Sequence, residues 1–243
     1  MTSATLDQLK TMRLFGMYDA LQALLKAASL KQYTHEEMLA HLIQSEWEDR
    51  DNRRITRLLK AAKFRYKASM AQINYNHPRE LDKGLMLRLS NCEYIAKAQN
   101  VILVGPTGVG KSYIASALGH QACLQGVKTF YANTYKLFSN LKKGKADGSY
   151  YNMIRRIEKQ QLLILDDFGL KPMDNHARMA LMEIIEDRHQ KFSTIITTQK
   201  PINHWHDIIG ESTIADAILD RLVHSAHKII LTGDSLRKNQ KKK

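Results

Sequence analysis

The 243-residue sequence has little cysteine, only Cys92 and Cys123. Neither residue lies in a CxxC pair or beside other metal-ligating residues, which argues against a disulfide framework and a structural zinc site. The sequence also lacks an apolar run of membrane-spanning length. Its first residues lack the basic start and apolar stretch of a secretory signal. We therefore expect a cytoplasmic protein with no membrane association.

Acidic residues are under-represented: 24 Asp and Glu stand against 37 Lys and Arg, a formal net charge of +13. This balance favours a polyanionic partner such as nucleic acid. Basic residues recur at three- and four-residue steps in one stretch, which predicts a stripe along a helix that contacts DNA phosphates. A solvated charged face is the ordinary alternative. The basic run comprises Arg50, Arg53, Arg54, Arg57, Lys60, Lys63, Arg65 and Lys67, and its first five members form the stripe that we expect to contact DNA. A second candidate, expected in a loop between strands, comprises Lys142, Lys143 and Lys145.

Proline is absent from the first 70 residues, and Gly16 is the single glycine there. Apolar residues recur at helical spacing in this region, which predicts that it is all helix. One helix should start at Thr34, because Glu37 three residues later completes a capping box. The apolar residues expected on one face of this helix are Leu39, Leu42, Ile43 and Trp47.

Turn-forming residues at positions 74–78 interrupt the helical pattern. We therefore expect a helical domain over residues 1–72, which binds DNA or a partner, and a second domain over residues 73–243. Short apolar runs separated by helix-like segments in the second domain predict a parallel sheet with helices on both faces, an α/β fold. The predicted strands are residues 101–104, 129–131, 162–165, 194–197 and 228–231.

A glycine-rich loop stands between the first predicted strand and a helix-like segment. It matches the phosphate-binding pattern G-x-x-x-x-G-K-[ST] in the context that this pattern requires. Its glycines let backbone N–H groups approach phosphates, Lys111 reaches the β- and γ-phosphate oxygens, and Ser112 ligates magnesium. The residues expected to contact ATP are Gly105, Pro106, Thr107, Gly108, Val109, Gly110, Lys111, Ser112 and Tyr113.

Two carboxylates follow the apolar run at residues 162–165. Their position predicts that they lie at the carboxyl edge of the sheet, beside the phosphate-binding loop. Asp166 is expected to hold magnesium, directly or through water, and Asp167 to act as the base that activates the attacking water. A turn with two acidic residues is the alternative, but it does not explain the glycine-rich loop upstream.

Polar residues after the fourth predicted strand should reach the same edge. Thr198 and Gln199 are candidates for a hydrogen bond to the attacking water or the terminal phosphate, although an ordinary polar loop has the same composition. Arg221 is a candidate arginine finger, supplied to a neighbouring subunit's ATP to stabilise the charge that develops during phosphoryl transfer. An ion pair with Asp220 on a helix surface is the plain alternative, and periodicity does not decide between the two.

Together these motifs resemble the IstB-like insertion-sequence ATP-binding proteins, relatives of the DnaC and DnaI helicase loaders within the AAA+ ATPases. The resemblance runs through residues 14–17, 58–64, 100–106, 163–169 and 215–224. It implies a P-loop AAA+ domain that follows a small all-α domain. It also implies that Lys111 and Ser112 form the Walker A pair and Asp166 and Asp167 the Walker B pair. Sensor 1 would be Thr198 or Gln199, the arginine finger Arg221, and the sensor 2 position Arg237.

Two positions depart from the family pattern. Ser112 and Tyr113 replace a threonine and a histidine, a change that we expect to preserve magnesium binding. Asp167 stands where most AAA+ proteins have glutamate, and its shorter side chain leaves the hydrolysis rate open.

The resemblance implies a helper of transposition. Its ATP-bound homo-oligomer would assemble on double-stranded target DNA, then recruit and stimulate a separate DDE transposase. A helicase loader would keep every ATPase motif and change only the partner, so it remains the alternative. Two further alternatives belong to other functional classes. A P-loop kinase for a small metabolite would not need the Asp166–Asp167 pair together with an arginine from a neighbouring subunit. A DNA scaffold that uses ATP only as a switch would hydrolyse little ATP, and phosphate release with and without DNA would reveal it.

Overall fold

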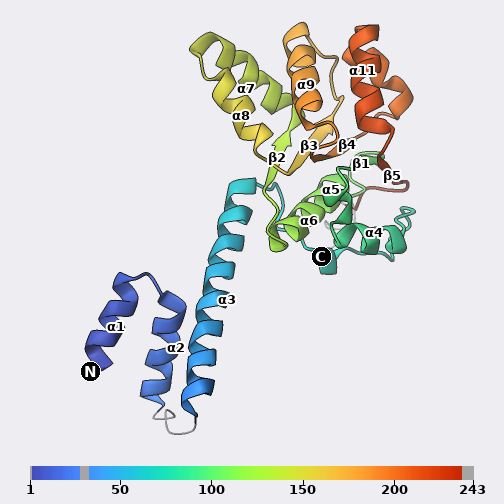
Figure 1. Cartoon of the computed structure of the whole chain (residues 1–243). Helices are drawn as coiled ribbons and strands as arrows, with labels where there is room; N and C mark the ends of the chain where they lie inside the picture. Colours follow the sequence, from blue (N-terminus) through green and yellow to red (C-terminus); the bar gives the residue numbers. More distant parts are fainter. Residues whose placement is uncertain (1, 28–32, 237–243) are drawn as a thin grey trace. The chain divides into compact units, whose positions relative to one another are not determined.

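The computed structural model describes residues 2–27 and 33–236, and these form two compact units that divide after Arg57 (Figure 1). The first unit contains α1 (Thr2–Thr11), α2 (Phe15–Lys26) and most of α3 (His35–Ala62). The predicted capping box starts α3: the Glu37 backbone N donates to Thr34 Oγ1 at 3.2 Å, and the Thr34 backbone N donates to Glu37 Oε2 at 2.8 Å. The helical N-terminal region is thus confirmed.

Helices α2 and α3 meet at Gly16, where a Cβ atom would lie only 2.3 Å from the Ser45 carbonyl oxygen. Leu14, the N-cap residue of α2, offers no side-chain cap. Instead Glu46 of α3 accepts hydrogen bonds from the backbone N–H groups of Gly16 at 2.8 Å and Met17 at 3.3 Å. A carboxylate at this position also favours the positive end of the α2 dipole. Glu46 therefore joins the two helices.

The free α2 N–H groups and a neighbouring arginine set the charge state of Glu46. Burial by itself raises the pKa of this carboxyl, but the hydrogen bonds from Arg50, Met17 and Gly16 outweigh burial and leave the pKa lowered. Glu46 thus remains ionised although its side chain is buried.

The apolar face expected on α3 is divided in the structure. Leu42 is half-buried, whereas Leu39, Ile43 and Trp47 are 58%, 52% and 71% exposed. The three exposed residues recur at four-residue steps and so form a row along α3. We call them the α3 apolar row.

We predict that Gly16→Ala destabilises the first unit by about 1–3 kcal/mol, because the added methyl group must push α2 away from the backbone of α3. Denaturant unfolding, with hydrogen exchange of the α2 amides, measures the effect. Gly84→Ala is the matched control, since a Cβ there would meet only the ends of the Asp82 and Arg88 side chains, at 3.2 Å and 3.7 Å. Equal stability of the two variants would contradict the close contact.

The second unit is built on a parallel five-stranded sheet of order β2-β3-β4-β1-β5. Its strands are β1 (Val101–Val104), β2 (Thr129–Asn133), β3 (Leu162–Phe168), β4 (Ser193–Thr198) and β5 (His227–Ile230). All five predicted strands are confirmed. The short helices η2 (Met70–Gln72) and η3 (Ile202–His204) lie outside the sheet. The remaining helices are α4 (Lys83–Ser90), α5 (Glu93–Ala96), α6 (Lys111–Leu124), α7 (Thr134–Asp147), α8 (Tyr150–Glu158), α9 (Asn175–Arg188), α10 (Trp205–Ile209) and α11 (Ser212–Val223).

Helices cover both faces of the sheet, as the sequence predicts (Figure 1). Helices α4, α5 and α6 pack on one face, and α7 to α11 pack on the other. Alternate strand residues enter the two cores: Leu103 joins the α6 side, and Ile102 joins the α9 side. Both faces are therefore apolar, which is why the strands read as continuous apolar runs.

Residues 58–72 belong to the second compact unit. Phe64, Tyr66 and Met70 from this segment pack against the core on the α6 side. The functional boundary expected after residue 72 remains a prediction. No helix among residues 2–27 and 33–236 is long and apolar enough to cross a membrane.

The expected loop at Lys142, Lys143 and Lys145 is wrong, because all three residues lie on α7. Asn133 caps the start of this helix by accepting a hydrogen bond from the Lys136 backbone N at 3.2 Å. The helix continues to Gly148, whose φ of 79° ends it in the left-handed conformation typical of a C-terminal cap.

Candidate nucleotide-binding site

The glycine-rich loop lies where the sequence predicts, between the end of β1 and the start of α6. Gly108 and Gly110 have φ values of 90° and 98°, in the left-handed region that favours glycine. Lys111 is the first residue of α6, so the backbone N–H groups at this helix start face the loop. The loop therefore has the conformation of an anion-binding turn.

The side chains of the loop bind its own backbone and the neighbouring strand. Lys111 is buried, and its Nζ donates to the carbonyl oxygens of Gly105 at 2.7 Å and Pro106 at 2.8 Å. Thr107 Oγ1 donates to Gln199 Oε1 at 2.8 Å. Gln199, a predicted phosphate-sensing residue, is thus brought directly to the loop.

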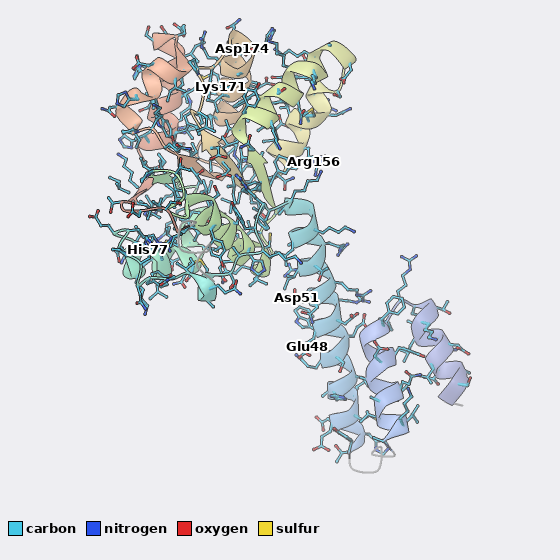
Figure 2. The ribbon with its side chains drawn as sticks, turned by 180° about the vertical axis from the view of Figure 1, so that it is seen from behind. Glu48, Asp51, His77, Arg156, Lys171 and Asp174 are labelled. Atoms are coloured by element: carbon cyan, nitrogen blue, oxygen red, sulfur yellow. The ribbon has the colours of Figure 1, made fainter. Side chains whose placement is uncertain are left out.

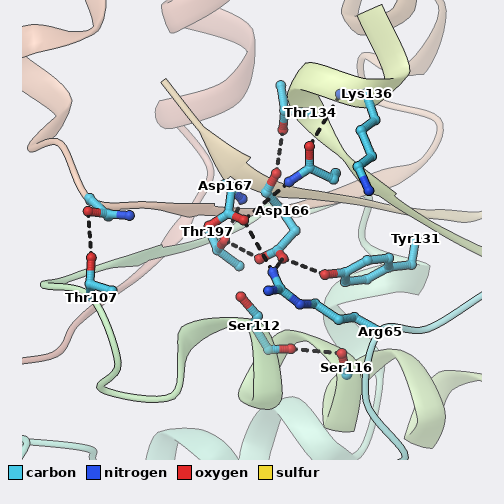
Figure 3. Close-up of polar contacts among 12 residues, drawn as sticks. Arg65, Thr107, Ser112, Ser116, Tyr131, Thr134, Lys136, Asp166, Asp167 and Thr197 are labelled. Atoms are coloured by element: carbon cyan, nitrogen blue, oxygen red, sulfur yellow. Dashed lines mark hydrogen bonds and ion pairs between the residues drawn. The ribbon is translucent and has the colours of Figure 1, made fainter. Parts of the chain in front are cut away.

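The two acidic residues at the end of β3 lie across from the loop (Figure 3), and Asp167 lines the site pocket whereas Asp166 is not part of its lining. Asp166 is fully buried; Thr197 Oγ1 donates to its Oδ1 at 2.5 Å, and the Tyr131 hydroxyl donates to its Oδ2. Burial and the bond to Asp166 raise the pKa of Tyr131, so this hydroxyl keeps its proton. Asp167 has a φ of 59° and accepts a hydrogen bond from Asn133 Nδ2 at 3.1 Å.

Arg65 also contacts both carboxylates, and the sequence reasoning did not assign it to this site. Its Nη1 lies 3.3 Å from Asp167 Oδ2 and 3.5 Å from Asp166 Oδ2. The sequence placed Arg65 in the general run of basic residues after α3, and no local pattern distinguishes it from its neighbours. Tyr131 and Asn133 were missed as site residues for the same reason. Thr197 belongs to the polar segment, residues 197–199, that the sequence places at this sheet edge.

The predicted residue Thr198 has another role in the structure. Its hydroxyl donates to the Phe168 carbonyl oxygen at 3.0 Å and so ties β4 to β3. Its neighbour Thr197 contacts the Walker B residues instead, since it also accepts a hydrogen bond from the Asp167 backbone N at 3.0 Å. Adjacent strand residues point to opposite faces of the sheet, which explains why Thr197, and not Thr198, contacts the acidic pair.

The site contains a pocket of about 360 Å³. Both the phosphate-binding loop and the Walker B end of β3 contribute to its lining. Figure 3 shows the Ser112 side chain below the carboxylates of Asp166 and Asp167. The residues of the pocket are Arg65, Tyr66, Thr107, Gly108, Gly110, Lys111, Ser112, Tyr113, Asp167, Leu170, Gln199 and Leu236.

The available ligands suit a magnesium ion that arrives with ATP. Among the described residues, no group of three or more His, Cys, Asp or Glu side chains could hold a metal. The residues that could hold such an ion are Ser112, through its hydroxyl, and Asp166, whose two carboxylate oxygens here accept hydrogen bonds from Thr197 and Tyr131. Magnesium in such sites takes its remaining ligands from phosphate oxygens and water.

Arg221 does not reach the pocket of its own chain. Asn100 Nδ2 donates to the Arg221 carbonyl oxygen at 3.2 Å, just before β1 begins, whereas the phosphate-binding loop follows the other end of β1. The guanidinium pairs with Glu186 Oε2 of α9 at 2.7 Å, so its partner is not the Asp220 of the plain alternative. The other expected arginine, Arg237, lies outside the described residues.

Comparison with known proteins agrees with this geometry. The model of the family described as IstB-like ATP binding protein matches residues 7–243. The chain belongs to this family. A putative insertion sequence ATP-binding protein of Sinorhizobium fredii is 45% identical over 239 residues, 98% of each chain. The IS21 putative ATP-binding protein of Pseudomonas aeruginosa is 29% identical and covers 91% of this chain and 84% of its own length.

Solved structures show the same fold at low sequence identity. The DnaI structure has a TM-score of 0.58 at 21% identity, over 73% of this chain and 94% of its own. The DnaC helicase loader has a TM-score of 0.56 at 20% identity, over 70% of this chain and 99% of its own. As an IstB-like protein with the AAA+ fold, the chain binds ATP and is an ATPase.

We predict that Lys111→Ala abolishes ATP binding, because the lysine charge that pairs with the β- and γ-phosphates is lost. Asp167→Asn should bind ATP normally but hydrolyse it about a hundredfold more slowly, since the amide cannot accept a proton from water. Titration with a fluorescent ATP analogue measures binding, and phosphate release measures turnover. Full turnover in either variant would contradict these roles.

Proposed function

We propose that this IstB-like protein is an ATP-dependent helper of transposition. It assembles with ATP on double-stranded target DNA and recruits a DDE transposase encoded by the same insertion sequence. The observation that carries the DNA part of this proposal is an arginine-lined hollow on the first unit. The relatives of this protein are described as insertion sequence ATP-binding proteins, which supports a transposase as the partner.

ATP hydrolysis in this proposal depends on residues at the carboxyl edge of the sheet. Lys111 leaves the carbonyl oxygens of the loop and pairs with the phosphates. Ser112 and Asp166 hold magnesium, which neutralises phosphate charge when bound. Asp167 orients and deprotonates the attacking water, and Gln199 contacts that water or the terminal phosphate. The hydrogen bonds of Tyr131 and Thr197 hold the Asp166 carboxylate in place.

Arg221 acts in a neighbouring subunit's site. Its place at the far end of β1 supports this role, because an arginine there cannot contact the phosphates bound by its own loop. Its guanidinium is partly exposed and must exchange Glu186 for the neighbour's phosphate. ATP would thus sit between subunits and favour their assembly.

We predict that Arg221→Ala binds ATP nearly normally but hydrolyses it about a thousandfold more slowly, since the arginine stabilises charge that exists only in the transition state. Mixing tests whether the arginine acts in trans. Arg221→Ala and Asp167→Asn subunits, each inactive alone, should recover phosphate release when combined. No recovery in the mixture would contradict a shared site.

The arginine hollow lies on the first unit and has a volume of about 800 Å³. Its lining comprises Arg13, Arg50, Asn52, Arg53, Arg54, Thr56 and Arg57, which includes four of the five residues of the predicted DNA stripe. Arg13, between α1 and α2, was not anticipated from the sequence. A concave surface lined by arginines suits the phosphate backbone of DNA and carries no base specificity by itself.

Ion pairs within α3 partly neutralise the hollow. Arg50 pairs with Glu46 at 2.6 Å, Arg53 with Asp49 at 2.7 Å and Arg54 with Asp51 at 2.7 Å. The side chains of Glu48 and Asp51 are visible on α3 in Figure 2. The acidic partners of Arg53 and Arg54 are partly exposed, and such pairs contribute little stability, so a phosphate can replace them. Glu46 is buried and keeps its contact with Arg50. Among the described residues, Arg13 and Arg57 form no ion pair.

The α3 apolar row supports a protein partner beside the DNA. Leu39, Ile43 and Trp47 are exposed together on a helix, and such apolar groups commonly mark protein contacts. A helicase in place of the transposase is the alternative. The helicase loader in the comparison shares only the fold at 20% identity, whereas the Sinorhizobium relative is 45% identical over nearly the whole chain. Binding measurements separate the two: tighter binding to duplex than to single-stranded DNA would favour transposition, and the reverse would favour helicase loading.

We predict that duplex DNA binds with little sequence preference, more tightly with ATP, and with strong salt dependence. Each cation that neutralises a phosphate contributes about 0.9 to the slope of log affinity against log salt. Changing Arg13, Arg54 and Arg57 to alanine should therefore flatten the slope by up to about 3 per bound subunit and leave ATP binding intact. Fluorescence anisotropy with unrelated duplexes measures this slope.

The matched control replaces Lys142, Lys143 and Lys145 of α7 with alanine, which removes the same charge from the second unit. It should change the slope less than the hollow variant does. A flatter slope in the control alone would move the DNA surface to α7.

A further inference from the structure

Arg65 lies in the nucleotide pocket although it precedes the sheet by many residues. It follows Ala62, the last residue of α3, after only Lys63 and Phe64. Its guanidinium lies 5.4 Å from the centre of the Tyr66 ring, and Tyr66 in turn contacts the Tyr113 ring of α6 at 6.2 Å between ring centres. These contacts hold Arg65 beside the first turn of α6, where Ser112 is found.

The guanidinium shares one ligand, Asp166, with the proposed magnesium ion. It pairs with Asp166 Oδ2 at 3.5 Å and Asp167 Oδ2 at 3.3 Å, and the Asp166 Oδ1 atom is already bonded to Thr197 (Figure 3). Magnesium near Asp166 would therefore bring two positive charges to the edge where Arg65 is placed. Two like-charged groups repel each other at this distance, so the present pairs weaken when the ion binds.

The same pocket offers Arg65 another anion. The side chain is 45% exposed, so its guanidinium has solvent-accessible space into which it can rotate, and the pocket that it lines also contains Lys111 and Ser112 of the phosphate-binding loop. Arginine binds phosphate through a planar fork of N–H donors, and such charge-assisted bonds are among the stronger ones in proteins. A terminal phosphate bound by this loop would lie in the same pocket as the Arg65 guanidinium.

We propose that Arg65 is a triphosphate-binding residue whose guanidinium, paired here with Asp166 and Asp167, turns to the terminal phosphate of bound ATP. ADP lacks that phosphate, so with ADP the guanidinium stays with the carboxylates. Arg65 thereby distinguishes ATP from ADP.

The test compares ATP with ADP. In Arg65→Ala, affinity for a non-hydrolysable fluorescent ATP analogue with magnesium should fall about tenfold, the effect expected of one lost charge-assisted hydrogen bond. Affinity for the fluorescent ADP analogue should stay within about twofold. Lys67→Ala is the matched control: Lys67 is exposed, carries the same charge on the same segment and makes no ion pair among the described residues. It should change neither affinity.

Two results would overturn the proposal. An equal loss of ATP and ADP affinity would mean that Arg65 only holds the carboxylates in place. Unchanged ATP affinity would mean that it does not reach the phosphate. Thermal unfolding verifies that Arg65→Ala folds, and Arg65→Lys, which keeps the charge but loses the fork, provides a second variant. The lysine variant should lose ATP affinity selectively but less severely, and unchanged ATP affinity in it would also count against the proposal.

The role of Arg65 rests on the proposed phosphate and magnesium site. The same nucleotide titration distinguishes failure of that site assignment from failure of the Arg65 role. If Lys111→Ala retains ATP binding, the nucleotide-site assignment fails. If Lys111→Ala loses binding while Arg65→Ala keeps its full preference for ATP over ADP, only the role of Arg65 fails. DNA binding enters neither measurement.

Discussion

The charge of Asp166 and Asp167 at the end of β3 constrains much of the second unit. Two adjacent carboxylates, one fully buried, are costly unless donors and cations surround them. Tyr131 of β2, Thr197 of β4 and Arg65 from the segment after α3 supply these contacts. In addition, Thr134 at the start of α7 donates to the Asp166 carbonyl oxygen at 2.8 Å. The acidic pair thus fixes four separate segments around one point.

The parallel sheet positions Asp166 and Asp167 relative to the other residues of the nucleotide site. Parallel strands direct all their carboxyl ends to one edge, so the loop after β1, the acids after β3 and Gln199 after β4 meet there. The opposite end of β1 is linked through Asn100 to the end of α11 and Arg221. One strand therefore separates the chain's own phosphate-binding loop from the arginine proposed for its neighbour.

The first unit is a small helical assembly with few buried side chains, so individual contacts between its helices matter. Gly16 lets α2 approach α3 closely, and Glu46 then caps α2 and pairs with Arg50. The same acidic residue that joins the helices thereby orients one wall of the arginine hollow. Packing and the proposed DNA surface are linked through a single carboxylate.

The sequence by itself determined the features that depend on neighbouring residues. Short continuous apolar runs predicted the five strands, the glycine pattern predicted the loop at residues 105–112, and Thr34 with Glu37 predicted the start of α3, because each is a short-range requirement of backbone geometry. The sequence did not reveal that α7 carries Lys142, since Gly144 and Gly148 suggest a loop until Asn133 is seen to cap the helix. Only the tertiary structure brought Arg65 to Asp166, added Arg13 to the hollow and placed Arg221 away from its own loop. These contacts join residues far apart in the chain, and no local periodicity records which distant side chains will converge.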